Sequence, residues 1–167
     1  INLNVGIMYY YAQQYDDAIK EFTKTLELDP TFLPARRMLG LAHAWKGMYA
    51  QAIAELERVV AVGSSDPIYV SSLGLCYAWA GRRPEAQKIL NDLIDRSRGS
   101  YVPAVYMAGI YAGLGDKDNA FRWLEKGYEE RSPGIRDIKV SRTWDTLRND
   151  PRYHDLLSRF KALTGCP

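Results

Sequence analysis

The sequence lacks the runs and residue patterns that mark membrane, secreted and metal-binding proteins. It contains no run of about 18 apolar residues, so no membrane span is expected. It does not begin with a basic segment followed by an apolar stretch, and therefore shows no signal peptide. Its two cysteines, Cys76 and Cys166, are too far apart in sequence to suggest a disulfide framework or a zinc site. We therefore expect a cytoplasmic location and no bound metal. The chain also lacks an initiator Met, and we expect it to be a piece of a longer protein.

The sequence also lacks a strong net charge. The value of +2 is too small to indicate a nucleic-acid partner. Residues 1–130 carry 14 Lys and Arg against 16 Asp and Glu, whereas residues 131–167 carry 8 against 4. A basic tail on a nearly neutral body is typical either of a solvated terminal face, which we favour, or of a segment with an acidic neighbour.

No pattern of catalytic residues is present. The Gly-x-x-x-x-Gly-Lys loop that binds phosphates does not occur. The two histidines, His43 and His154, lie in different segments, and no Ser-His-Asp or Cys-His set can be assembled around either. We therefore predict that the chain is not an enzyme and binds no cofactor. His43 is expected to be a packed, hydrogen-bonded residue.

A repeat of 34 residues runs through most of the chain. Small residues recur at this spacing in one column and alanines recur at it in a second column. The first column holds Gly6, Gly40, Gly74 and Ala108, and the second holds Ala18, Ala52, Ala86 and Ala120. A tyrosine or a histidine follows each residue of the first column by three positions. Repeats of this length are typical of stacked helical units.

The two columns of small residues predict helices that pack closely in pairs. With no bulk at either place, the two helices approach each other and their larger side chains interlock. The predicted turns support the same helix pairs. Gly47, Gly81 and Gly115 share one column, and a helix commonly ends in a left-handed residue at such a place. Gln13 holds this column in the first repeat, and if it adopts the left-handed conformation there, the strain is on the order of 1 kcal/mol. Each pair alone leaves an apolar face bare, so the pairs are expected to stack.

These columns resemble the tetratricopeptide repeat (TPR) family. The fragments that carry the resemblance are Tyr15-x-x-Ala18-x-x-x-Phe22 followed by Pro30; Leu39-Gly40-x-x-His43 with Tyr49-x-x-Ala52; Leu73-Gly74-x-x-Tyr77 with Ala86; and Ala108-x-x-Tyr111 with Gly115 and Ala120. The match covers residues 1–134 nearly without gaps. The tryptophan typical of the first helix of a repeat is absent, a departure that is common in the family.

The resemblance implies an all-α fold, a right-handed solenoid of antiparallel helix pairs. The expected repeats are 1–32, 33–66, 67–100 and 101–134. Residues 135–167 break the period and are expected to form a C-terminal cap with a short turn and a final helix, because an end repeat needs a cover over its apolar face.

The final helix has its own start signal and apolar stripe. Asp150 is a predicted N-cap, with Pro151 at the first helical position. The stripe, at helical spacing, consists of Tyr153, Leu156, Leu157 and Phe160.

The C-terminal segment has a narrower resemblance as well. Residues Trp123–Pro133, with Leu147–Tyr153 downstream, are similar to the C-terminal end of repeat regions in bacterial multidomain signalling proteins. In those proteins the repeats follow a winged-helix DNA-binding domain, a protein kinase domain or a nucleotide cyclase domain. The resemblance implies that this chain is the sensory or docking end of a larger bacterial regulatory protein. Ser141-Arg142 departs from the Asp-Pro usual there.

In the TPR family the first helix of each pair lines a concave groove that holds partner segments. The resemblance therefore places the candidate partner-binding residues at Leu3, Ile7, Tyr10, Tyr11, Arg37, Leu41, Trp45, Ser71, Leu75, Trp79 and Val105. One column of the groove is aromatic in three successive repeats, with Tyr11, Trp45 and Trp79. The two tryptophans either contact a partner or pack in the core, and the sequence leaves both alternatives open.

Arg37 is the one cation among these groove residues. Chaperone-binding members of the family hold a C-terminal carboxylate with several Lys, Arg and Asn residues. We therefore predict that this chain does not bind the C-termini of chaperones.

Two functional hypotheses follow. The first is a protein-interaction module that docks a partner peptide or domain in the groove. The second is a structural module that forms a homodimer or restrains an upstream effector domain, with the groove filled by the chain itself, by an upstream helix or by the basic tail. Neither hypothesis involves a membrane or direct binding of nucleic acid.

Overall fold

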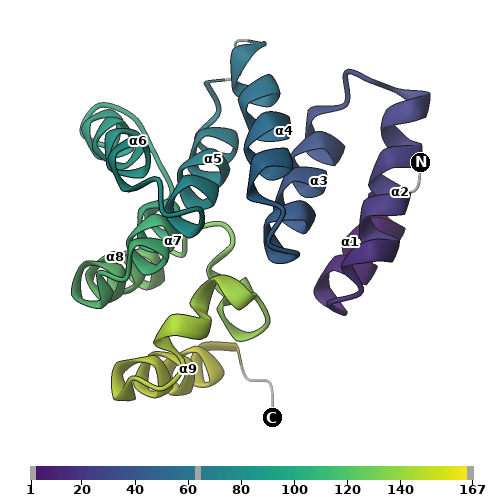
Figure 1. Ribbon diagram of the computed structural model, residues 1–167. Helices are drawn as coiled ribbons and strands as arrows, with labels where there is room; N and C mark the ends of the chain where they lie inside the picture. Colours follow the sequence, from purple (N-terminus) through teal and green to yellow (C-terminus); the bar gives the residue numbers. More distant parts are fainter. Residues whose placement is uncertain (1–2, 63–64, 165–167) are drawn as a thin grey trace. The chain divides into compact units, whose positions relative to one another are not determined.

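The chain forms two compact units. The computed structural model describes residues 3–62 and 65–164, with side chains described up to residue 159. The N-terminal unit comprises Ile1–Ile89 and the C-terminal unit Leu90–Pro167, so that the division falls inside helix α6 (Arg83–Arg96). No strand occurs among the described residues, and the expected all-α class is confirmed (Figure 1). The finer division into four repeats and a cap stays a prediction.

The N-terminal unit is built from antiparallel helix pairs. Helix α1 (Leu3–Tyr11) packs against α2 (Tyr15–Leu28), and α3 (Leu33–Trp45) packs against α4 (Tyr49–Ala61). Helix α5 (Pro67–Trp79) then packs against α4. Because α2 also packs against α3, the pairs stack in chain order (Figure 1).

Residues without side chains set the distance between paired helices. A Cβ atom added to Gly40 would lie 2.9 Å from Cγ of Leu56 and 3.2 Å from the carbonyl oxygen of Ala52. A Cβ atom added to Gly6 would lie 2.7 Å from Cδ1 of Phe22. Interiors packed at this density have no room for an extra methyl group. The predicted close approach of Gly40 to the helix of Ala52 is therefore confirmed.

The turns between paired helices contain left-handed residues at the predicted column. Gly47, Gly81 and Gly115 have φ angles of +75°, +75° and +80°. Gln13 occupies the same column and also adopts the left-handed conformation, with a φ angle of 61°. A residue with a Cβ atom in this conformation costs roughly 1–2 kcal/mol.

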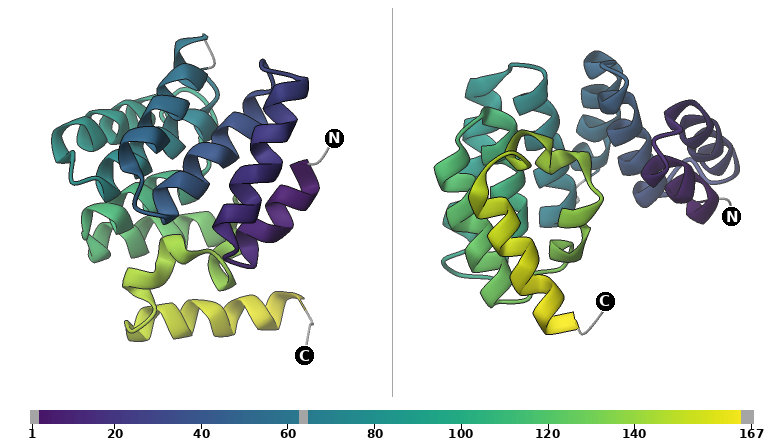
Figure 2. Two further views of the ribbon diagram at one scale, coloured as in Figure 1. Left: turned by 45° about the vertical axis from the view of Figure 1, so that its right-hand side comes forward. Right: turned by 90° about the horizontal axis from the view of Figure 1, so that it is seen from below.

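The C-terminal unit joins one helix pair to the end of the chain. Helices α7 (Ala104–Leu114) and α8 (Lys117–Glu129) are followed by two 3₁₀ helices, η1 (Ile135–Lys139) and η2 (Arg142–Leu147), and by α9 (Pro151–Thr164), as Figure 2 shows. One apolar core includes Val105, Ala108, Phe121, Leu124, Ile138, Trp144, Leu147, Tyr153 and Leu156. The residues after α8 therefore pack onto this helix pair, through two 3₁₀ helices where the sequence predicted a short turn, and then through a final helix.

Polar contacts hold the cap in place as well. The Asp150 carboxylate accepts a hydrogen bond from the backbone N–H of Arg152 at 3.0 Å, which confirms Asp150 as the cap of α9. The Tyr153 hydroxyl donates to the carbonyl oxygen of Ile138 at 2.5 Å. The guanidinium of Arg152 pairs with Asp118 of α8 at 2.8 Å. These contacts connect η1, α8 and α9.

Other expectations from the sequence concern single residues and sites. Cys76 is fully buried, as expected for a small apolar residue, and burial raises the pKa of its thiol to about 12. Cys166 and the side chain of Phe160 lie outside the described residues. None of the described helices is long and apolar enough to cross a bilayer. The described residues contain no group of three or more His, Cys, Asp or Glu arranged to hold a metal ion.

Replacing Gly40 by alanine tests the close approach of α3 and α4. Helix propensity alone would stabilise Gly40→Ala by about 1 kcal/mol. We expect the opposite, a loss of about 1–2 kcal/mol in the free energy of unfolding, because the new methyl group would overlap Leu56 and the backbone of Ala52. Urea denaturation measures the difference. Gly99→Ala is the matched control, since the space around Gly99 is open. Equal stability of the two variants would contradict the predicted overlap.

Candidate functional site

An aromatic cluster connects the first helices of the N-terminal unit. It consists of Tyr10, Tyr11, Tyr15, Trp45 and Trp79. The ring centroids of Trp45 and Trp79 lie 4.2 Å apart with the planes tilted by 45°. The indole Nε1–H of Trp45 donates a hydrogen bond to the Tyr10 hydroxyl at 2.7 Å. The Tyr10 ring meets the Tyr11 and Tyr15 rings edge-on, at centroid distances of 5.5 and 5.9 Å. The cluster thus spans α1, the start of α2, α3 and α5.

The repeat explains most of this arrangement. Trp45 and Trp79 are the last residues of α3 and α5 and occupy the same column, so stacking of the pairs brings their rings together. Tyr11 holds this column in α1, yet the residue that contacts Trp45 is its neighbour Tyr10. Successive residues of an α-helix point about 100° apart. Tyr11 accordingly stays 42% exposed, while Tyr10 turns toward α3. Tyr15 was not among the predicted site residues, because it begins a second helix.

The cluster belongs partly to the core and partly to the surface. Tyr10, Trp45 and Trp79 are all half-buried. Burial raises the pKa of the Tyr10 hydroxyl above its ordinary value, while the hydrogen bond from Trp45 and the charge of Arg37 act in the opposite direction. The hydroxyl therefore stays protonated at neutral pH. Both tryptophans pack against neighbouring rings and also keep part of their surface exposed, so they take part in packing, while contact with a partner stays a prediction.

Arg37 places one half-buried positive charge near the cluster. Its Nη1 donates to the Ser72 hydroxyl at 3.4 Å, which is a long hydrogen bond. No carboxylate among the described residues forms an ion pair with it. Its neighbour in sequence, Arg36, pairs with Glu55 at 2.6 Å. Since a guanidinium has five N–H donors, Arg37 retains donors that these contacts do not use.

The other predicted residues of the N-terminal unit differ in exposure. Three of them are half-buried: Leu3, Ile7 and Leu75. Leu41 and Ser71 are buried, with 8% and 6% of their surface exposed. The Ser71 hydroxyl donates to the carbonyl oxygen of Ile68 at 3.1 Å within its own helix. Leu41 and Ser71 therefore offer a partner much less surface than the aromatic cluster does.

Val105, the predicted residue of the C-terminal unit, is buried in the core that α7 and α8 share with the end of the chain. Only 6% of its surface is exposed. The segment η2 lies along α7, since a Cβ atom added to Gly109 would lie 3.6 Å from Cγ2 of Thr143. The Thr146 hydroxyl lies 3.5 Å from the carbonyl oxygen of Ala112. The chain therefore places η2 against this first helix, while filling of the groove by the chain itself stays a prediction.

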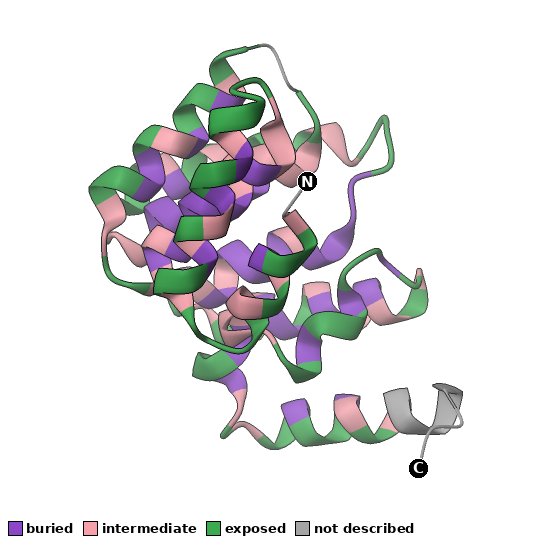
Figure 3. Ribbon diagram, turned by 90° about the vertical axis from the view of Figure 1, so that its right-hand side faces the viewer, coloured by how far each residue is buried: buried purple, intermediate pink, exposed green. Residues whose placement is uncertain are grey.

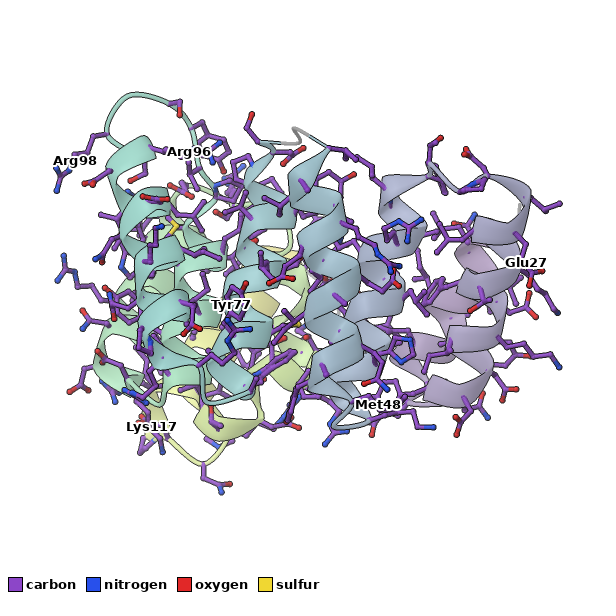
Figure 4. All side chains as sticks on the ribbon, turned by 45° about the horizontal axis from the view of Figure 1, so that its top comes forward. Glu27, Met48, Tyr77, Arg96, Arg98 and Lys117 are labelled. Carbon is purple, nitrogen blue, oxygen red and sulfur yellow. The ribbon has the colours of Figure 1, made fainter. Side chains whose placement is uncertain are left out.

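His43 differs from the expectation in one respect. It is half-buried, but its Nδ1 atom has no hydrogen-bond partner in the part of the chain that the structure describes, so the expected hydrogen bond is wrong. The same column holds Tyr77 one repeat later, and its hydroxyl donates to Oε1 of Glu57 at 2.7 Å (Tyr77 is labelled in Figure 4). Thr23 stands one repeat before Glu57, so His43 has no carboxylate at this place. Burial lowers the pKa of His43 below its ordinary value.

Comparison with known sequences points to one family. Two profiles, both described as Tetratricopeptide repeat, match residues 9–74 and 72–100. Together these ranges cover 9–100, which is more than half of the 167 residues. No curated protein sequence matches the chain.

Solved structures share the fold at low sequence identity. A chain of the APC/C hetero-tetramer Cut9–Hcn1 aligns with 98% of this chain at a TM-score of 0.65 and 18% identity, and this chain spans 33% of its length. Nearly identical TPR-like repeats from Podosopora anserina align with 98% of this chain and 93% of their own at a TM-score of 0.58 and 16% identity. YrrB, a TPR protein with an unusual peptide-binding site, aligns with 96% of this chain and 83% of its own at a TM-score of 0.51 and 18% identity. Likeness at such identities concerns the fold alone.

Removing the Tyr10 hydroxyl tests the hydrogen bond at the centre of the cluster. We expect Tyr10→Phe to lower the free energy of unfolding by about 1 kcal/mol, because the half-buried indole N–H of Trp45 loses its acceptor. Tyr101→Phe is the control and should change stability by less than about 0.5 kcal/mol, since Tyr101 is 60% exposed. A double-mutant cycle with Trp45→Phe should give a coupling of about 1 kcal/mol. Additive effects would rule out this hydrogen bond.

Proposed function

We propose, on the premise that this chain belongs to the tetratricopeptide repeat family, that its N-terminal unit binds a segment of a partner protein at the aromatic cluster. Proteins with this fold act as protein-interaction scaffolds rather than enzymes, and we propose the same for this chain. The observation that carries the proposal is the gathering of aromatic side chains from three successive first helices. One structural relative, YrrB, is itself a TPR protein with a peptide-binding site.

The chemistry of the cluster defines the kind of segment that would bind. Trp, Tyr and Arg side chains supply most of the binding energy at protein interfaces, and they do so where they are rigid and partly desolvated. Trp45 and Trp79 restrict each other's rotation, and Tyr10 fixes the orientation of the Trp45 indole. A partner segment with large apolar side chains would therefore bury surface on rings that are already ordered. Arg37 would add a hydrogen-bond donor at one place only.

The wider context is a prediction from the sequence of the C-terminal segment. The similarity of Trp123–Pro133 and Leu147–Tyr153 to the end of bacterial signalling proteins supports a place in a larger regulatory protein. In such a protein the chain would dock a partner and thereby act on an upstream effector domain. The alternative function is a structural or autoinhibitory module. It is supported by η2, because this segment of the chain packs against α7.

Selection of binding peptides tests the proposed site. Peptides selected from a random displayed library against the whole chain should carry large apolar residues. Trp45→Ala and Trp79→Ala should each weaken their binding at least about tenfold, which corresponds to about 1.4 kcal/mol. The matched control is Trp123→Ala, since Trp123 is a half-buried tryptophan that packs under Lys126 in the C-terminal unit.

Calorimetry measures these affinities at a temperature at which circular dichroism shows every variant folded. A lower melting temperature with unchanged affinity would assign both tryptophans to the core alone and would refute the proposed site.

Peptides that end in a free carboxylate provide a separate test. Because Arg37 is the one cation among the predicted site residues, a peptide with the acidic C-terminus of a chaperone should show no saturable binding up to about 1 mM. The same peptide with an amidated C-terminus should also show no saturable binding. Fluorescence polarisation measures both, and tight binding that amidation abolishes would show this prediction to be wrong.

A further inference from the structure

The first helices of the N-terminal unit carry no carboxylate. Helices α1, α3 and α5 contain no Asp or Glu. The second helices α2 and α4 hold Asp16, Asp17, Glu21, Glu27, Glu55 and Glu57. The Lys and Arg residues of the three first helices are Arg36 and Arg37. Arg36 pairs with Glu55 of α4, so Arg37 is the one guanidinium of these helices that no carboxylate of the described residues neutralises.

The charge of Arg37 lies in largely buried surroundings. Every residue of α3 and of α5 is buried or half-buried, and Figure 3 colours these classes on the ribbon. The guanidinium also lies close enough to act electrostatically on the Tyr10 hydroxyl, which accepts the hydrogen bond from Trp45. A charge that is partly removed from water loses hydration and interacts more strongly with an opposite charge than an exposed one does. This place therefore favours an anionic group.

One edge of the Arg37 guanidinium is unused. Its Nη1 donates to the Ser72 hydroxyl at 3.4 Å, and that hydroxyl donates in turn to the carbonyl oxygen of Ile68 at 2.7 Å. Its Nε and Nη2 atoms form no hydrogen bond with the described residues. In the described part of the chain, the buried side-chain atoms without a hydrogen-bond partner belong to His43 and Arg159, so both nitrogens of this edge keep access to solvent. Two parallel N–H donors of this kind match the two oxygens of a carboxylate.

We propose that this edge of Arg37 binds the side-chain carboxylate of an Asp or Glu in the partner segment, an inference that rests on the function proposed above for the aromatic cluster. Charge complementarity selects an acidic segment, because a Lys or Arg of the partner would find no carboxylate on α1, α3 or α5. Chaperone-binding members of the family hold a chain end with several cations. Arg37 provides a single one, so it fits one carboxylate within a segment whose apolar side chains contact the cluster.

The register of α3 limits where the acidic residue stands in the segment. Arg37 and Trp45 are eight residues apart in this helix, which separates their backbone positions by about 12 Å along its axis. An extended segment spans about 12 Å with three to four residues. The partner should therefore carry an Asp or Glu within about four residues of a large apolar side chain.

Parallel selections from one random displayed peptide library test the charge preference. The targets are the whole wild-type chain and its Arg37→Glu variant, both shown to be folded by circular dichroism. Peptides from the wild-type selection should carry Asp or Glu near their large apolar residues, and peptides from the Arg37→Glu selection should carry Lys or Arg there. Arg98→Glu is the matched control, since the Arg98 side chain is 76% exposed in the C-terminal unit (labelled in Figure 4), and it should select the same peptides as the wild type.

Calorimetry on one peptide from the wild-type selection then measures the contact itself. Replacing the acidic residue of the peptide by glutamine should weaken binding at least about fivefold, because a charge-assisted hydrogen bond is lost. Arg37→Gln should weaken it by a similar factor, and the two changes together should weaken it no further. Raising the salt concentration from about 50 mM to about 500 mM should remove most of this difference. Arg98→Gln should bind like the wild type.

The outcomes separate this inference from the function on which it rests. Peptides that need Trp45 and Trp79 but bind the wild-type and Arg37→Gln chains equally would overturn the role of Arg37 and leave the proposed site intact. Wild-type and Arg37→Glu selections with the same charged residues would overturn it as well. Peptides indifferent to both tryptophans, or no enrichment in any selection, would refute the proposed site and this inference with it.

Discussion

The structure depends on how closely two paired helices can approach. Where Gly40 faces the helix that carries Ala52 and Leu56, even one added carbon atom would overlap its neighbours. Close contact of this kind buries the apolar side chains around it and gains many small dispersion contacts. The small residues that permit this approach recur after 34 residues. Each helix pair therefore has nearly the same thickness, and the next pair can stack on it in the same register.

The candidate site is a consequence of this register. Side chains in one column come close to one another only if successive pairs repeat without a shift. Trp45 and Trp79 occupy one column, and their rings lie 4.2 Å apart. The hydrogen bond from Trp45 to Tyr10 extends the contact to α1. The resulting cluster combines packing between helices with an aromatic surface that stays partly exposed, and its rings are ordered by one another.

Much of the fold could be predicted because it repeats. The columns of small residues predicted the helix pairs, the turn column predicted the left-handed glycines Gly47, Gly81 and Gly115, and Asp150 with Pro151 predicted the start of α9. The two 3₁₀ helices could not be predicted, since they lack a hydrophobic period. At the site, the burial of Leu41, Ser71 and Val105 depends on neighbouring elements rather than on position within the repeat. Likewise, the choice of Tyr10 over Tyr11 as the partner of Trp45 depends on a rotation of about 100° between neighbouring helical residues.

The most direct test of the close approach is the distance between α3 and α4 in solution. Nuclear Overhauser spectra of the folded chain, with the Leu and Ala methyl groups assigned, report which protons lie next to the two Hα protons of Gly40. The account predicts strong cross-peaks from these protons to the methyl groups of Leu56, which lies at the contact. A folded chain in which these Hα protons show no cross-peak to Leu56 or Ala52 would contradict it.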